Sequence, residues 1–173
     1  MFILTKKIIE ISKSIAISLV VAIFIISFIF QVVTVSGESM IPTLQNNDKL
    51  VLEKVSYRII SPRKNDIVVV RYPADIRERI IKRVIAVAGD KVKISDNKLY
   101  INGKAIDEYY KSENFMQDYD EAEVPQDSIF ILGDNRNFSK DSRSSDIGFV
   151  KLNLIEGKAV IRLYPFNKMG RIR

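Results

Sequence analysis

The strongest hydrophobic pattern in the chain is an uncharged stretch of 21 residues at positions 15–35, IAISLVVAIFIISFIFQVVTV. A helix rises about 1.5 Å per residue, so this stretch is long enough to cross the ~30 Å hydrocarbon layer of a bilayer. A cleavable secretory signal is the alternative, but its apolar core usually has about 7–15 residues and ends at a small-residue site. This stretch is longer and lacks such a site. We therefore expect a retained transmembrane helix over residues 15–35.

The charges before this stretch predict its orientation. Lys6, Lys7 and Lys13 precede it and only Glu10 opposes them, and basic flanks tend to stay in the cytoplasm. We expect residues 1–14 to be cytoplasmic and residues 36–173 to form one extracytoplasmic domain. The protein would then be a single-pass protein of the cell membrane.

The rest of the chain alternates between apolar and polar positions in short runs that turn residues separate. The Asn102-Gly103 pair is typical of a tight hairpin between 98–101 and 104–106. The pattern predicts a mainly β domain with antiparallel strands. The predicted strands cover 49–57, 66–72, two within 78–94, 98–101, 104–106, 128–132 and 157–166.

Two long segments lack a strand pattern. Residues 107–123, DEYYKSENFMQDYDEAE, are acidic and polar, and we interpret them as a mobile surface loop. GDNRNFSKDSRSSD, at 133–146, is a long polar loop between two predicted strands. Gly37, Pro42 and residues 46–48 indicate a turn-rich segment directly after the predicted membrane helix.

The composition excludes several kinds of active site. The chain has no histidine and no cysteine, so it cannot form a Ser-His-Asp triad, a disulfide or a zinc site with the usual ligands. We expect no metal and no cofactor, and any catalytic base must be Lys, Asp, Glu or Tyr. The net charge of +6 is spread along the chain. Beside a membrane helix, this charge favours a lipid surface over nucleic acid as a partner.

A serine without histidine requires another base, and a lysine kept neutral by burial can serve. Lys82 lies in RIIKRVI, where strand alternation puts it on one face with Ile80 and Val84. Most such lysines extend their ammonium to the surface. Ser39, between a glycine and a proline, is by itself more typical of a turn. Local pattern alone therefore leaves both residues open to a structural interpretation.

The order of the motifs adds a resemblance. VSGESMIPTL, directly after the predicted helix, resembles the nucleophile box of bacterial type I signal peptidases. NDIVVVRYP and RIIKRVIAVAGDKV are similar to that family's strand and lysine boxes. GDNR, followed by Ser139, Asp141, Arg143 and Gly148, is similar to its last box. The four boxes follow the order of the family.

The resemblance implies a role for each matching residue. Ser39 would be the nucleophile and Lys82 the general base, while the Ser139 hydroxyl would be hydrogen-bonded to the lysine and orient it. Asp141 and Arg143 would hold the last box in shape. The residues that would line shallow pockets for small side chains, as in Ala-x-Ala before the cleaved bond, are Val35, Met40, Leu44 and Ile81.

The sequence departs from the family pattern in several places, which include Asn137-Phe138 and the run at 144–147 before Gly148. Some members carry a serine two residues before the nucleophile that completes the oxyanion hole, and here that position is Gly37. The backbone N–H of Ser39 would be one donor, and Ser36, a backbone amide or a water would have to supply the second. The insertion of the longer family members is missing, and residues 107–123 take its place.

Other functions have weaker support. Ser61-x-x-Lys64 and Ser95-Asp96-Asn97 fit motifs of penicillin-recognising enzymes, but no K-T-G follows and Ser61 precedes a proline. Self-cleaving repressors share a Ser-Lys dyad but have no membrane helix. A non-enzymatic anchored β module is the remaining alternative. The expected function is removal of signal peptides from preproteins at the outer membrane surface.

Overall fold

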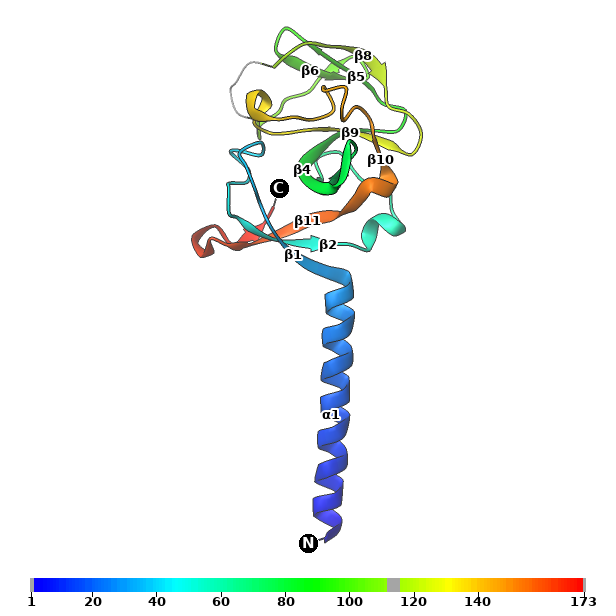
Figure 1. Ribbon diagram of the computed structural model, residues 1–173, viewed down its shortest axis with the longest axis vertical. Coiled ribbons are helices and arrows are strands. Elements are labelled where there is room, and N and C mark those ends of the chain that lie inside the picture. Colours follow the sequence, from blue (N-terminus) through cyan, green and yellow to red (C-terminus); the bar gives the residue numbers. More distant parts are fainter. Residues whose placement is uncertain (1, 112–115, 173) are drawn as a thin grey trace.

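The computed structural model describes residues 2–111 and 116–172, and Figure 1 shows one long helix that leads into a β domain. The longer elements are α1 (Phe2–Ile29), β1 (Phe30–Thr34), β2 (Lys49–Glu53), β3 (Ile67–Tyr72), β4 (Asp75–Val87), β5 (Lys91–Ser95), β6 (Lys98–Ile101), β8 (Tyr119–Glu123), β9 (Ser128–Leu132) and β11 (Ile155–Tyr164). The short ones are η1 (Ser56–Arg58), β7 (Lys104–Ala105), η2 (Arg136–Phe138), β10 (Val150–Lys151), η3 (Leu152–Leu154), η4 (Phe166–Lys168) and β12 (Gly170–Arg171).

The strands form two antiparallel sheets. The larger sheet has the order β1-β2-β11-β3-β4-β9-β10, and β12 adds to β11. The smaller sheet has the order β7-β6-β5-β8. The predicted fold class, a mainly antiparallel β domain preceded by one apolar helix, is confirmed.

Helix α1 is long and apolar enough to cross a membrane from Lys6 to Ile29, and the domain buries none of it. The prediction that the helix extends over 15–35 is wrong at its end, because residues 30–34 form β1 and pair with β2 from Phe30↔Glu53 to Thr34↔Lys49. An uncharged β-branched run suits a strand as well as a membrane helix, so hydropathy alone could not locate this boundary.

The apolar runs predicted as strands build the core. Residues 67–70 of β3 and all of β9 are buried, as continuous β-branched runs predict for strands covered on both faces. Strand β4 crosses between them, pairing with β3 on one side and β9 on the other. This central position fixes the middle of β4, which carries Lys82 and Arg83.

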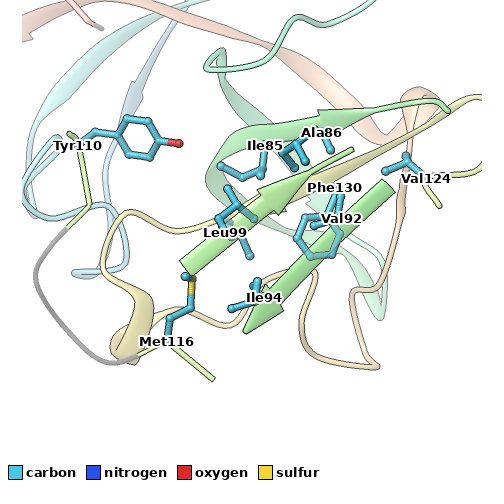
Figure 2. Close-up of a cluster of buried hydrophobic side chains, with 11 residues drawn as sticks. Ile85, Ala86, Val92, Ile94, Leu99, Tyr110, Met116, Val124 and Phe130 are labelled. Atoms are coloured by element: carbon cyan, nitrogen blue, oxygen red, sulfur yellow. The ribbon is translucent and has the colours of Figure 1, made fainter. Parts of the chain in front are cut away.

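The smaller sheet packs on β4 and β9 through a second cluster of buried side chains (Figure 2). Tyr110 and Met116 belong to this cluster, and the backbone N–H of Met116 donates to Asn97 Oδ1 over 2.8 Å. The prediction of a surface loop over 107–123 is therefore wrong for these two residues and for residues 119–123, which form β8. Residues 112–115 lie outside the described residues.

Gly157 allows β11 to approach β2 closely, because a Cβ at this position would lie 2.2 Å from the backbone oxygen of Glu53. We expect Gly157→Ala to lower the free energy of unfolding by about 1–3 kcal/mol, since the rigid backbone must shift. Thermal unfolding of the full chain in detergent measures the effect. Gly103→Asn is the control, because that turn position has open space and a φ of +75°, which asparagine tolerates. Equal melting temperatures for the two variants would contradict the close approach.

Candidate active site

Ser39 and Lys82 meet at the edge of the β domain. Ser39 lies in the turn segment between β1 and β2, and Lys82 Nζ donates a hydrogen bond to Ser39 Oγ over 2.7 Å. Lys82 lies on β4, an interior strand of the larger sheet, and pairs there with Val68 on β3. Two residues that are 43 positions apart in the sequence thus form the pair that the motif order predicts.

Lys82 is one of the least exposed lysines that the structure describes, with 4% of its surface accessible. Burial lowers the pKa of its ammonium from 10.5 to about 8, although the charges of Asp141 and Asp134 act in the opposite direction. Desolvation disfavours the charged form because water no longer stabilises it. A lysine with this pKa is substantially neutral near pH 8, and a neutral amine can accept a proton.

A loop after β9 holds the backbone around Ser39. The backbone N–H of Asn135 donates to the Ser39 carbonyl over 3.0 Å, and Asn135 Nδ2 donates to the Glu38 carbonyl over 3.2 Å. Gly133 permits this approach, because a Cβ there would lie 2.5 Å from the Ser39 oxygen and 2.2 Å from Ser139 Oγ. The segment that carries Ser39 is therefore held by Gly133 and Asn135, which lie more than 90 positions later in the sequence.

A buried ion pair ties the same parts together. Arg83, which is fully buried, donates from Nε and Nη2 to the two carboxylate oxygens of Asp134 over 2.9 and 2.7 Å. The Thr43 hydroxyl donates to Asp134 over 2.5 Å and accepts from Arg83 over 3.2 Å. Burial acts to lower the pKa of Arg83, but the bonds and charge of Asp134 outweigh it and the pKa is raised. Arg83 therefore stays charged, next to a lysine that is easily deprotonated.

The pair expected to shape the last box lies together. Arg143 donates from Nε and Nη2 to Asp141 over 2.8 and 2.9 Å, and Arg143 Nη2 also donates to the Arg136 carbonyl over 2.7 Å. Asp141 in turn accepts from the Gly133 backbone N–H over 3.1 Å. These bonds connect the polar loop to the glycine that packs against Ser39.

Ser139 does not make the hydrogen bond to the lysine that the family pattern implies. Its hydroxyl oxygen is buried and has no hydrogen-bond partner among the described residues. The side chain packs over the bare Cα of Gly133 instead. The expected orienting bond is thus absent, and Lys82 is positioned by its strand and by Ser39.

A cleft of about 140 Å³ opens at Ser39 between β1 and β4. Three of the four residues expected to form substrate pockets, Val35, Met40 and Ile81, line it. Leu44 does not line it and is fully buried in the core cluster that also contains Val35 and Met40. An apolar residue close to a nucleophile in the sequence can belong either to the core or to a substrate pocket, and the sequence pattern does not distinguish these two positions.

The backbone before Ser39 turns at Gly37, whose φ is +92°. The Gly37 N–H donates to Asn46 Oδ1 over 3.1 Å. Ser36 is exposed and lines the cleft together with Ser39. Gly37 thus provides the positive φ that the turn requires, and Ser36 provides a hydroxyl beside Ser39 in the cleft.

The residues of the penicillin-type motifs have structural contacts. Lys64 Nζ donates to Asp90 over 2.9 Å. Asn97 lies in the β5–β6 turn at a φ of +61° and accepts from Met116. In the described ranges, 2–111 and 116–172, no group of three or more Asp, Glu, Cys or His could hold a metal ion.

Comparison with known proteins shows which family the chain resembles. The family model described as "Signal peptidase, peptidase S26" matches residues 8–164. A probable signal peptidase I-2 of Synechocystis is 37% identical over 93% of this chain and 75% of its own length. Signal peptidase I S of Bacillus subtilis is 35% identical over 96% of this chain and 94% of its own length. A crystal structure of a signal peptidase I from Enterococcus faecalis superposes with a TM-score of 0.51 and 36% identity, over 58% of this chain and 97% of that one.

These likenesses cover most of the chain, and the matched residues 8–164 include the segments that carry Ser39 and Lys82. They define the protein as a serine endopeptidase. Within that class, the chain belongs to the signal peptidase family, peptidase S26.

Several residues at the site received no role from the sequence, although they lie within the recognised boxes. Thr43, Arg83 and Asp134 form the buried network, and Gly133 and Asn135 fix the Ser39 backbone. One signal was available for Arg83, because it is adjacent to Lys82 on an apolar strand. Adjacent side chains point to opposite faces, so a strand covered on both faces buries both cations, and a buried cation requires a partner. The identity of that partner depends on tertiary structure.

Burying Lys82 costs stability, which a variant can recover. At pH 7 a lowered lysine pKa corresponds to a cost of roughly 3 kcal/mol, because the native state binds the proton less well than the unfolded chain. We expect Lys82→Met to raise the free energy of unfolding at pH 7 by about 1–3 kcal/mol. The gain should shrink as the pH rises from about 8 to 10.5, because in this range the native wild type is already neutral at Lys82 while its unfolded chain still binds the proton, so wild-type stability rises with pH.

Denaturant unfolding of the full chain in detergent, followed by tyrosine fluorescence, measures this gain. The control is Lys93→Met, because Lys93 is exposed on β5 and should change stability by less than about 0.5 kcal/mol. A gain that does not depend on pH would contradict the lowered pKa.

Proposed function

We propose that this protein removes N-terminal signal peptides from exported preproteins at the outer membrane surface, with Ser39 as nucleophile and Lys82 as general base. The observation that carries the proposal is the 2.7 Å hydrogen bond from a buried lysine of lowered pKa to an accessible serine hydroxyl. The names of the relatives, each a signal peptidase I, support the choice of substrate.

The chemistry follows from this pair. Neutral Lys82 Nζ accepts the proton of Ser39 Oγ as the oxygen attacks the carbonyl carbon of the scissile peptide bond. The resulting ammonium then donates that proton to the leaving amine, and the signal peptide remains as an ester on Ser39. Lys82, neutral again, takes a proton from water as the water oxygen attacks the ester. The Lys82 ammonium then returns this proton to Ser39 Oγ as the ester bond breaks, which releases the free acid and restores the serine.

The developing oxyanion requires donors near the Ser39 Oγ. The backbone N–H of Ser39 is one. The Gly37 N–H already donates to Asn46, so we assign the second donor to the hydroxyl of Ser36, which lines the same cleft. Ser36 replaces the serine that some relatives carry two residues before the nucleophile.

The cleft favours small side chains before the cleaved bond. Its volume of about 140 Å³ is close to that of one or two small residues, and Val35, Met40 and Ile81 give it apolar walls. This size fits the Ala-x-Ala preference of the family. β1 and β4 flank the cleft, so an extended substrate segment can lie between them.

The placement of the site suits a substrate held in a membrane. Helix α1 ends at Ile29, and Ser39 follows after one five-residue strand. We propose that α1 spans the membrane with Lys6, Lys7 and Lys13 on the cytoplasmic side and the β domain outside. A signal peptide anchored in the bilayer would then present its cleavage site at the depth of the cleft.

Removing either member of the pair should abolish activity. Ser39→Ala and Lys82→Ala of the full chain are each expected to reduce preprotein cleavage by at least about 10³-fold, because the nucleophile or its base is lost. Ser61→Ala and Lys64→Ala are the matched controls and should keep wild-type rates. Gel analysis of an exported precursor in vesicles measures cleavage. Undiminished cleavage by the Lys82→Ala chain would exclude the dyad, and no cleavage by any chain would favour a non-enzymatic module.

The pH dependence should report the lysine. The base must be neutral, so kcat/KM for a precursor should rise with pH and level off above about 8, where Lys82 is deprotonated. A stopped assay over pH 6 to 11 in constant ionic strength gives the profile. A rate that continues to rise up to pH 10.5, the pKa of an ordinary lysine, would contradict a base with the lowered pKa of Lys82.

A further inference from the structure

A second cleft, with a volume of about 510 Å³, lies apart from Ser39 beside the end of α1. Its charged lining residues are four cations and one carboxylate: Lys54, Arg58, Arg71, Arg79 and Glu156. An excess of cations around one cavity attracts an anion, and nothing in the proposed peptide cleavage uses them.

Two of the cations contact the last turn of α1. Lys54 Nζ lies 3.4 Å from the Ser27 carbonyl, and the guanidinium of Arg58 lies 5.7 Å from the centre of the Phe28 ring. Figure 1 shows β1 and β2 at the edge of the domain nearest this end of the helix. If α1 spans the bilayer as proposed, its last turn is at the depth of the lipid headgroups. The cleft therefore opens where phosphate groups are concentrated.

The other two cations are held in place and partly accessible. Arg71 and Arg79 each donate from Nε to Glu156, over 3.0 and 2.6 Å, and their side chains are 51% and 57% exposed. Their remaining N–H groups make no other hydrogen bond or ion pair within residues 2–111 and 116–172. A fixed guanidinium with free N–H groups is suited to bind two phosphate oxygens at once.

We propose that this cleft binds the phosphate of an anionic phospholipid at the outer end of α1. Ile59 and Ile60, which follow Arg58, are 83% and 53% exposed and would contact the acyl chains next to that headgroup. The proposal rests on the proposed membrane position of α1 but not on the catalytic roles of Ser39 and Lys82. Arg79 lines both clefts, so the bound lipid lies next to the substrate site.

Native mass spectrometry of the full chain, ejected from nanodiscs of equal phosphatidylglycerol and phosphatidylcholine, tests the site. The Ser39→Ala chain is used throughout, so that lipid binding is measured without catalysis. We expect retained phosphatidylglycerol to exceed phosphatidylcholine. The double variant Lys54→Gln/Arg58→Gln should reduce this preference by about 30-fold, because each basic residue near an anionic surface contributes on the order of 1 kcal/mol.

The matched control is Lys93→Gln/Lys98→Gln, which removes two exposed positive charges from the smaller sheet and should keep the preference. Glu156→Gln should increase the preference for phosphatidylglycerol, because the cleft loses its negative carboxylate. Arg58→Gln alone, at an exposed position, serves if the double variant has a lowered melting temperature.

Three results would overturn the proposal. The parent chain could retain both lipids equally, or the control pair could lose as much preference as the cleft pair. Release of phosphatidylglycerol by excess inorganic phosphate would assign the cleft to a free anion. None of these results bears on whether Ser39 and Lys82 cleave preproteins, which the precursor assay tests separately.

Discussion

Lys82 reaches Ser39 from the middle of β4, where only 4% of its surface meets water. Much of the fold serves this burial. β3 and β9 pair with β4 along its two edges, and the smaller sheet packs against it. The loop after β9 holds the Ser39 backbone next to Lys82. In a chain without histidine, an amine can act as a base near neutral pH only when water is kept from its charged form.

Adjacent residues on β4 show how environment decides the state of a basic side chain. Arg83 is more deeply buried than Lys82, yet it remains charged because Asp134 binds it through two hydrogen bonds. Lys82 has a serine hydroxyl as its partner, which stabilises the ammonium far less than a carboxylate does. Strand alternation separates the two faces, so one strand carries both a structural cation and a titratable amine.

The sequence was sufficient for the fold class, most strands and the Ser39–Lys82 pair, because these depend on local alternation and on ordered motifs. The residues 30–34 were misassigned because a β-branched run fits a membrane helix and a strand equally. Leu44 and Ser139 were misassigned for another reason: whether a side chain faces a cleft, a lysine or the core depends on neighbours distant in sequence. Met116 illustrates the same limit, since its polar surroundings in the sequence conceal a fully buried position.

The clamp on the Ser39 backbone, formed by Asn135, also links the site to a distant part of the chain. Asn135 and Glu38, which it joins, are 97 positions apart, and contacts of such long range close large loops at a cost in chain entropy. The first hundred residues include both Ser39 and Lys82 but neither Asn135 nor Asp134, the buried partner of Arg83. The geometry around Ser39 therefore depends on residues 133–135 of the loop after β9 as much as on the Ser39–Lys82 pair, so a chain truncated before that loop would retain both residues without the contacts that place them.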